Sequence, residues 1–251
     1  MTQRPQFLGL VYDVDGTIAD HFTPPPRALR DLIADLDEAG VVQVLASGKY
    51  HEYLGGMARG LGLTVTGWVI GENGGTIFDW TALHLEVLGA HVPEVEELRR
   101  ELWAEHLAPD KFYEEPNVAG VTIFPRGRDY GEAEALLALM QRIVRAHGWE
   151  LAPEIHPDAA VVAVQQEVGK GTALRAIADR VGVPADRFVA FGEGVNDLTM
   201  LEIAYPVAPA DAHPRVAELV RRRGGYLASQ PGPAGVLEGF AHLRREGLVG
   251  F

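Results

Sequence analysis

Two aspartates at the end of an apolar run are the residues in this sequence best placed to do chemistry. Asp13 and Asp15 follow residues 7–12 and precede the pair Gly16-Thr17. One carboxylate could attack a phosphorus atom and form an acyl phosphate, while the other exchanges a proton with the leaving oxygen and then with water. Because both carboxylates and the phosphate are anionic, this chemistry needs a cation, and Mg²⁺ suits such oxygen ligands.

Taken alone, the Asp-x-Asp-Gly motif is equally typical of an ordinary turn after a strand. A calcium-binding loop also begins Asp-x-Asp, but it needs Gly at its sixth position and Glu at its twelfth. This sequence has Ile18 and Pro24 at those positions. Neither Gly-Lys pair has the earlier glycine of a P-loop, Ser47 lacks the preceding glycine of a nucleophile elbow, and His51-Glu52 lacks the second His of a zinc protease.

Three further segments could complete a phosphate site around the aspartates. Ser47-Gly48 follows a second apolar run, and its hydroxyl and backbone N–H groups could hold phosphate oxygens. Lys170 stands at the start of a predicted helix and could bring its ammonium group to the phosphate. The loop at 192–197, Gly-Glu-Gly-Val-Asn-Asp, offers two more carboxylates for a metal. Each segment alone is as readily explained by a helix cap or a solvated side chain.

The elements that would position these residues alternate short apolar runs with helical patterns. Near the N-terminus, strands are predicted at 7–12, 41–45 and 68–70, with helices at 29–39 and up to about residue 63. Near the C-terminus, the pattern predicts strands at 188–191 and 205–207, and helices at 173–181, from about 196, at 214–222 and at 234–246. This βαβ alternation predicts an α/β fold with a doubly wound parallel, Rossmann-like core. The carboxyl ends of its strands would gather the polar residues at one edge.

The middle of the chain differs in character. Helical patterns cover 92–107 and 130–147, and strand-like runs lie at 120–124, 149–151 and 159–165. We therefore expect an α+β cap domain over 80–167, inserted into a catalytic core made of 1–79 and 168–251. Such an insert could close over the strand ends and choose the substrate. Its candidates for contact with an anionic leaving group are Lys111, Arg126, Arg128 and His156.

Composition narrows the classes of partner. The chain has 251 residues, a hydrophobic fraction of 47%, a formal net charge of −13 and no cysteine. The length and the apolar fraction predict a globular fold, and the missing thiols exclude disulfides and a cysteine nucleophile. An acidic surface disfavours nucleic acid and anionic membranes. With no recognisable targeting segment, we expect a cytoplasmic monomer or homodimer that acts on a small-molecule phosphate ester.

The four polar segments in this order resemble the motifs of the haloacid dehalogenase superfamily. Asp13-x-Asp15-Gly16-Thr17, Ser47-Gly48, Lys170-Gly171 and Gly192-Glu193-x-x-Asn196-Asp197 match them in turn. The place and size of the insert, and the segment 71–75 (Gly-Glu-Asn-Gly-Gly), are similar to subclass IIB and to archaeal-type phosphoglycolate phosphatases and sugar-phosphate phosphatases. The resemblance covers the core, about two thirds of the chain, and leaves the insert without a recognised motif.

The resemblance implies a Mg²⁺-dependent phosphatase. Asp13 would be the nucleophile and a metal ligand, and Asp15 would be the general acid/base and lend its backbone carbonyl to the metal. Ser47 and Lys170, with Gly48 and Asn196, would bind the phosphoryl group, and Glu193 and Asp197 would complete the metal shell. The family's fourth motif usually starts Gly-Asp, so Glu193 is a departure. Glu193 could bind the metal directly, bind it through water, or leave that task to Asp197.

Two other functions remain open at this level. A phosphosugar mutase would return the phosphoryl group to its substrate instead of to water. A non-catalytic protein that binds a phosphorylated ligand would agree with the Glu193 substitution.

Overall fold

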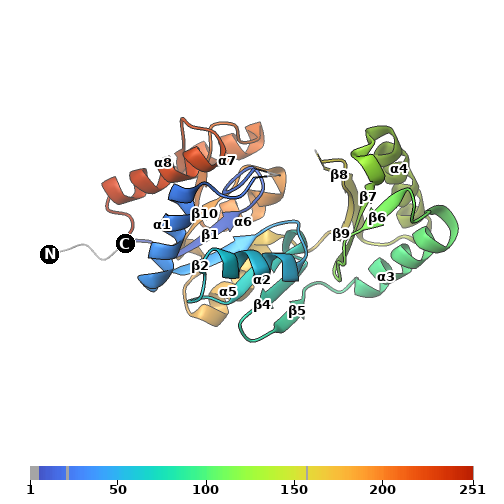
Figure 1. The fold of residues 1–251 in the computed structure, drawn as a ribbon, viewed down its shortest axis with the longest axis horizontal. Coiled ribbons are helices and arrows are strands. Elements are labelled where there is room, and N and C mark those ends of the chain that lie inside the picture. The colour runs from blue at the N-terminus through green and yellow to red at the C-terminus, as the bar shows by residue number, and fades with distance from the viewer. Residues whose placement is uncertain (1–5, 21–22, 157, 251) are drawn as a thin grey trace. The chain divides into compact units, whose positions relative to one another are not determined.

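The computed structural model describes residues 6–20, 23–156 and 158–250 (Figure 1). The chain divides into two compact units, Met1–Leu85 with Gly169–Phe251, and Glu86–Val168. The larger unit is therefore assembled from both ends of the chain. It contains all of the candidate site residues named from the core motifs.

The larger unit is built on an eight-stranded sheet in the order β12-β11-β10-β1-β2-β3-β4-β5. These strands are β1 (Gly9–Asp13), β2 (Val42–Ala46), β3 (Trp68–Gly71), β4 (Thr76–Asp79), β5 (His84–Val87), β10 (Phe188–Phe191), β11 (Tyr205–Ala208) and β12 (Tyr226–Leu227). The six strands from β12 to β3 are parallel, whereas β4 runs antiparallel to β3. The predicted α/β fold with a parallel Rossmann-like core is confirmed.

Helices cover both faces of this sheet (Figure 1). They are α1 (Arg27–Glu38), α2 (His51–Gly60), α5 (Lys170–Val181), α6 (Leu198–Ile203), α7 (Pro214–Arg223) and α8 (Gly232–Arg245). Side chains alternate along each strand, so Leu10 and Tyr12 of β1 join the apolar cluster under α1 and α8. Asp13, one residue further on, belongs to the opposite face, from which α5 approaches. In the described part of the chain, no helix has the length and hydropathy needed to cross a bilayer.

The structure differs from the sequence expectation at the junction between the units. The β4–β5 hairpin was not predicted, because His84–Val87 is half-exposed or exposed and lacks a continuous apolar run. The larger unit therefore extends to Leu85, whereas the expected boundary lay at 79. Helix α5 begins at Lys170, as expected for this residue, although the helical pattern itself was evident only from 173. Lys170 thus lies in the first turn of the helix.

The smaller unit has a four-stranded antiparallel sheet in the order β6-β7-β9-β8. Its strands are β6 (Phe112–Glu114), β7 (Gly120–Pro125), β8 (Leu151–Ile155) and β9 (Val161–Gln165). One apolar cluster joins this sheet to α3 (Val92–Glu101), which continues into a wider turn over Leu102–His106, and to α4 (Tyr130–His147). The strand expected at 149–151 begins later because α4 ends in a left-handed Gly148, which carries Trp149 back over the helix.

Candidate active site

Asp13 is the last residue of β1, in the middle of the parallel sheet. It lies in register with Ala46 of β2, and its neighbour Tyr12 lies in register with Phe191 of β10. The loops that follow these three strands therefore leave the same edge of the sheet, as parallel topology requires. Asp13 is only 6% exposed, and its Oδ2 accepts a hydrogen bond of 2.8 Å from the Thr17 hydroxyl.

Lys170 is the cation of this site. Its side chain is completely buried, and its Nζ donates to Oδ1 of Asp13 and to Oδ1 of Asp197, each at 2.6 Å. Burial alone would lower the pKa of Lys170, but the two carboxylates raise it above its usual value. Lys170 is therefore a permanent positive charge, and a solvated lysine at this position is excluded.

Asp197 holds Lys170 and the loop before it. Its Oδ1 accepts from Lys170, while its Oδ2 accepts from the backbone N–H groups of Glu193 and Gly194, both at 2.8 Å. The side chain is fully buried. Its Oδ1 keeps one lone pair beside the bond to Lys170, so the metal-ligand role expected from the sequence stays a prediction.

Glu193 lies against the turn that carries Asp15. A Cβ atom on Gly16 would come within 2.8 Å of Oε1 of Glu193, and Gly16 has a φ of +83°, so both contact and backbone favour glycine there. Burial, with the charges of Asp197 and Asp211, raises the pKa of Glu193 to about 7. Asp15 is partly buried in the same turn.

The site carries more negative charge than its lysine can balance. Burial and the charge of Asp197 raise the pKa of Asp13 to about 7, even though Lys170 acts in the opposite direction. The side-chain atoms near it that could coordinate a metal are oxygen atoms, the type of ligand that Mg²⁺ prefers. Among the described residues, no three acidic or histidine side chains are grouped closely enough to form a metal cluster by themselves. A metal here would therefore also need a backbone oxygen and water molecules as ligands. Mg²⁺ commonly retains several waters and takes only one or two carboxylates, so the residues present fit a magnesium ion.

Ser47 and Gly48 lie directly after β2, beside the strand that ends in Asp13. Ser47 is 2% exposed, its N–H donates to the carbonyl of Ile70, and its Oγ accepts from the N–H of Lys49 at 3.2 Å. The hydroxyl thus shapes the turn between β2 and α2. Its hydrogen remains a donor for an anion, so phosphate binding by Ser47 stays a prediction.

Asn73 is a site residue to which the sequence assigned no role. Its N–H donates to the carbonyl of Ser47, and its Oδ1 accepts from Nδ2 of Asn196 at 2.9 Å. Gly74 packs so tightly that an added Cβ would lie 2.6 Å from the backbone nitrogen of Lys170. Segment 72–74 therefore contacts the loops carrying Ser47, Lys170 and Asn196.

The backbone of this segment is itself unusual. Glu72, Asn73 and Gly74 all have positive φ, at 53°, 56° and 103°. Non-glycine residues rarely adopt this conformation, and clusters of it are typical of functional sites. The sequence Gly-Glu-Asn-Gly-Gly at 71–75 could have indicated this backbone, because glycine and asparagine adopt the left-handed conformation most readily.

We expect Asn73→Gly to reduce turnover without unfolding the protein. Glycine keeps the left-handed backbone but removes the amide that holds Asn196, and such a misplacement should lower kcat by about 10- to 100-fold. Turnover of an aryl phosphate and the thermal unfolding midpoint provide the measurements. If Asn73 acts through Asn196, adding Asn73→Gly to Asn196→Ala should change kcat by less than about twofold, because coupled residues are not additive. Unchanged kcat in Asn73→Gly would contradict this role.

The candidates for contact with the leaving group lie in the smaller unit, in local interactions. His156 Nε2 lies 3.0 Å from Oε1 of Glu154, and Arg128 forms an ion pair of 3.5 Å with Asp158. Arg126 donates to the carbonyl of Pro109 at 3.0 Å. Three of the four candidate residues therefore have partners within the smaller unit. A role of any of the four in binding a substrate stays a prediction.

Known proteins are similar to this chain over most of its length. A sequence profile of the haloacid dehalogenase-like hydrolases matches residues 10–97 and 133–222. A phosphoglycolate phosphatase of Methanoculleus marisnigri is 31% identical over 198 residues, which are 78% of this chain and 80% of that protein. A phosphoglycolate phosphatase of Methanospirillum hungatei is 25% identical over 232 residues, 92% of this chain and 94% of the relative.

Solved structures share the fold at lower sequence identity. A haloacid dehalogenase-like hydrolase from Bacteroides thetaiotaomicron superposes with a TM-score of 0.71 and 19% identity, over 96% of this chain and 99% of that one. The sucrose-phosphatase of Synechocystis sp., solved with sucrose and phosphate, superposes with a TM-score of 0.62 and 18% identity, over 96% and 99% of the two chains. At these identities the likeness concerns the fold alone.

Proposed function

The chain belongs to the haloacid dehalogenase-like hydrolases and is a phosphatase, and we propose that it is a Mg²⁺-dependent phosphomonoesterase with Asp13 as its nucleophile. The observation that carries this proposal is the buried group of Asp13, Lys170 and Asp197 at the carboxyl end of β1. Burying a lysine and two carboxylates costs desolvation free energy that ion pairing does not always repay, so stability alone is a weak reason for such a group. Here it fixes the carboxylate that would attack phosphorus.

Asp13 is held for attack by its two donors. Lys170 binds one oxygen and Thr17 binds the other. Each carboxylate oxygen has two lone pairs, so a pair remains to form the bond to phosphorus while the bond to the leaving oxygen breaks. The product of this step is an aspartyl phosphate and an alcohol. Asp15 would donate the proton to the leaving oxygen and then accept one from the water that cleaves the aspartyl phosphate.

The remaining residues would bind the phosphoryl oxygens. The charge of Lys170, the hydroxyl of Ser47 and the backbone N–H of Gly48 would stabilise the charge that develops on them. Asp13, the backbone carbonyl of Asp15 and the Glu193 carboxylate would hold the magnesium ion. When bound, Mg²⁺ supplies positive charge that lets anionic carboxylates and an anionic phosphate share one site.

We expect chelation to abolish phosphate release and added Mg²⁺ to restore it. Glu193→Gln keeps the size of the side chain but removes its charge, so the Mg²⁺ concentration needed for half-maximal activity should rise by at least about tenfold. Phosphate release measured over a Mg²⁺ titration checks both statements. Full activity in excess chelator would overturn the metal assignment, and an unchanged Mg²⁺ requirement in Glu193→Gln would exclude Glu193 as a ligand.

The pH dependence of stability gives a second measure of Glu193. Its pKa is raised to about 7 in the folded protein from an ordinary value of 4.5. The folded state therefore holds this proton more tightly than the unfolded state. In chelator, the free energy of unfolding should decrease as the pH rises from about 4.5 to about 7. Glu193→Gln cannot titrate there, so the decline in its thermal midpoint should be smaller than in wild type. Equal declines in the two proteins would contradict the assigned pKa.

The substrate we propose is a small phosphorylated acid of the phosphoglycolate type. Its support is the activity named for the relatives in Methanoculleus and Methanospirillum, which match the chain over most of its length. A panel of phosphate esters, including 2-phosphoglycolate and several sugar phosphates, should give the highest kcat/KM with the phosphorylated acid. Free phosphate must appear in step with the alcohol product. An isomerised phosphosugar without free phosphate would indicate a mutase, and tight binding without turnover a non-catalytic protein.

A further inference from the structure

His51 is a buried polar residue that the proposed mechanism does not use. It begins α2, three residues after Gly48, and its side chain is only 7% exposed. Its ring packs edge to face with that of Phe78 of β4, with the ring centroids 5.1 Å apart. Burying two polar ring nitrogens costs free energy unless they find partners. The groups that face these nitrogens therefore indicate what His51 does in the fold.

The two ring nitrogens of His51 face two carboxylates in different surroundings. Nε2 lies 3.2 Å from Oε2 of Glu52, which is exposed. Nδ1 lies 3.8 Å from Oε1 of Glu72, whose side chain is completely buried. Within the described residues Nδ1 has no hydrogen-bond partner, so its attraction to Glu72 acts across this gap or through a bridging water. Because an ionised carboxylate only accepts, Nδ1 can serve Glu72 only as an N–H donor.

Glu72 belongs to the segment that packs against the proposed phosphate-binding turn. Its N–H donates to the carbonyl of Lys49, and the N–H of Asn73 donates to the carbonyl of Ser47, each at 3.0 Å. Its φ of 53° is a conformation that non-glycine residues keep only where surrounding contacts hold it. A Cβ on Gly71 would lie 3.3 Å from the backbone nitrogen that begins α2. A displaced Glu72 would therefore release the turn that carries the proposed phosphate donors.

We propose that His51 is a positioning residue whose Nδ1 holds the buried carboxylate of Glu72 and, through Glu72, the phosphate-binding turn at 47–48. The hydroxyl of Ser47 and the N–H of Gly48 would then lie where the phosphoryl oxygens develop charge. His51 itself would touch neither substrate nor metal. Its effect on turnover rests on the proposed phosphatase reaction, whereas its effect on the backbone does not.

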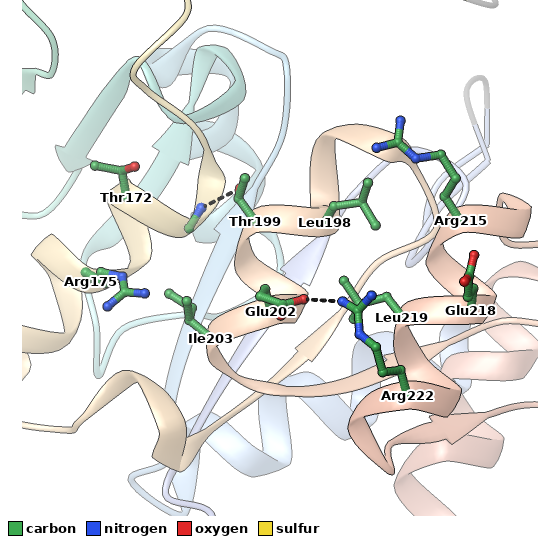
Figure 2. A pocket seen from close by; sticks show the side chains of 11 residues that line it. Thr172, Arg175, Leu198, Thr199, Glu202, Ile203, Arg215, Glu218, Leu219 and Arg222 are labelled. Atoms are coloured by element: carbon green, nitrogen blue, oxygen red, sulfur yellow. Dashed lines mark hydrogen bonds and ion pairs between the residues drawn. The ribbon is translucent and has the colours of Figure 1, made fainter.

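Lys170 has anchors that do not involve His51. Two carboxylates accept from its Nζ, and the next residue, Gly171, donates from its N–H to the hydroxyl of Thr199 at 3.0 Å (Figure 2). Loss of His51 should therefore leave the cation of the site in place while it disturbs the donors of the turn. We expect kcat to fall with little change in KM, because the lost alignment matters most where charge develops.

Three substitutions of His51 separate the roles of its two ring nitrogens. Asparagine places an amide nitrogen near the position of Nδ1, glutamine places one near that of Nε2, and leucine replaces neither. With an aryl phosphate, His51→Leu and His51→Gln should lower kcat by about 10- to 100-fold and change KM by less than about threefold. His51→Asn should restore kcat to within about threefold of wild type. Glu52→Gln is the matched control, because it alters only the exposed partner of Nε2, and its kcat should stay within about twofold of wild type.

Hydrogen exchange tests the same positioning without any reaction. The amides of Glu72 and Asn73, followed in a peptide covering 71–75, should exchange at least about tenfold faster in His51→Gln and His51→Leu than in wild type, because their acceptors lie in the released turn. Peptides of β10 should keep the wild-type rate. Absence of turnover in wild type would count against the proposed reaction, and the exchange rates would then decide the role of His51.

Four results would overturn the proposal. They are wild-type kcat in His51→Leu with its thermal midpoint retained, unchanged exchange at 71–75 in that variant, equal acceleration of exchange in β10, and failure of His51→Asn to recover the activity that His51→Leu loses. Equal acceleration in β10 would show a general loss of stability in place of a local one.

Discussion

Asp13→Asn should lose phosphatase activity by at least about 10⁴-fold in kcat, because an amide oxygen cannot attack phosphorus as a carboxylate does. The change is nearly isosteric, and the amide oxygen of the variant can still accept from Thr17 or Lys170. Asp197 also remains to balance the charge of Lys170. The protein should therefore fold, and the loss should be one of chemistry. Phosphate release from 2-phosphoglycolate and from an aryl phosphate measures it.

The covalent intermediate can be tested on the same pair of proteins. Acid quenching of wild type during turnover of ³²P-labelled substrate should leave label on the protein, and hydroxylamine should release it. Asp13→Asn should retain none. Asp31→Asn is a matched control, because Asp31 is an exposed aspartate of α1 that pairs with Arg27, and its activity should stay within about twofold of wild type. Substantial turnover by folded Asp13→Asn would exclude Asp13 as the nucleophile.

Lys170→Met should damage both activity and stability. Methionine approximates the length of the side chain but leaves Asp13 and Asp197 buried without their shared cation. Loss of one partner from a buried ion group costs about 3–5 kcal/mol. The loss of positive charge at the phosphoryl group should lower kcat by about 10²- to 10³-fold. Urea unfolding at pH 7.5 and phosphate release measure the two effects.

A double variant shows whether the loss of stability arises from the unpaired carboxylates. Lys170→Met/Asp197→Asn removes one of the two buried charges that the single change leaves behind. It should therefore be more stable than the sum of its single changes predicts. Arg30→Met serves as the control, because Arg30 is an exposed cationic residue of α1 to which no role in the site is given. Additive losses in the double variant, or wild-type stability in Lys170→Met, would contradict this account of the buried group.

The core could be predicted well from sequence because its signals are local. Buried parallel strands appear as short apolar runs, and β1, β2, β3 and β10 lie close to where those runs predicted them. The β4–β5 hairpin could not be predicted, since its second strand is half-exposed and carries no apolar run. The boundary between the units was misplaced for the same reason.

The residues of the candidate site could also be selected from the sequence, because Asp13 ends a strand, Lys170 begins a helix, and Asp15, Ser47 and Glu193 follow strands. The groups to which these side chains bind in the folded protein could not be predicted. Both carboxylate oxygens of Asp197 bind within the protein, to Lys170 and to two backbone N–H groups. Asn73 contacts Asn196 across 123 positions of sequence. Such pairings depend on which loops the sheet order brings together.

The sequence by itself determined the fold class, the family and the oxygen-rich chemistry of the strand ends, because apolar runs and glycine turns act over a few residues. Only the tertiary structure decided how the charges are distributed: one buried lysine serves Asp13 and Asp197, and Glu193 lies against Gly16. The physical reason is that burial and charge pairing depend on distances between segments far apart in the chain, and the folded sheet sets those distances.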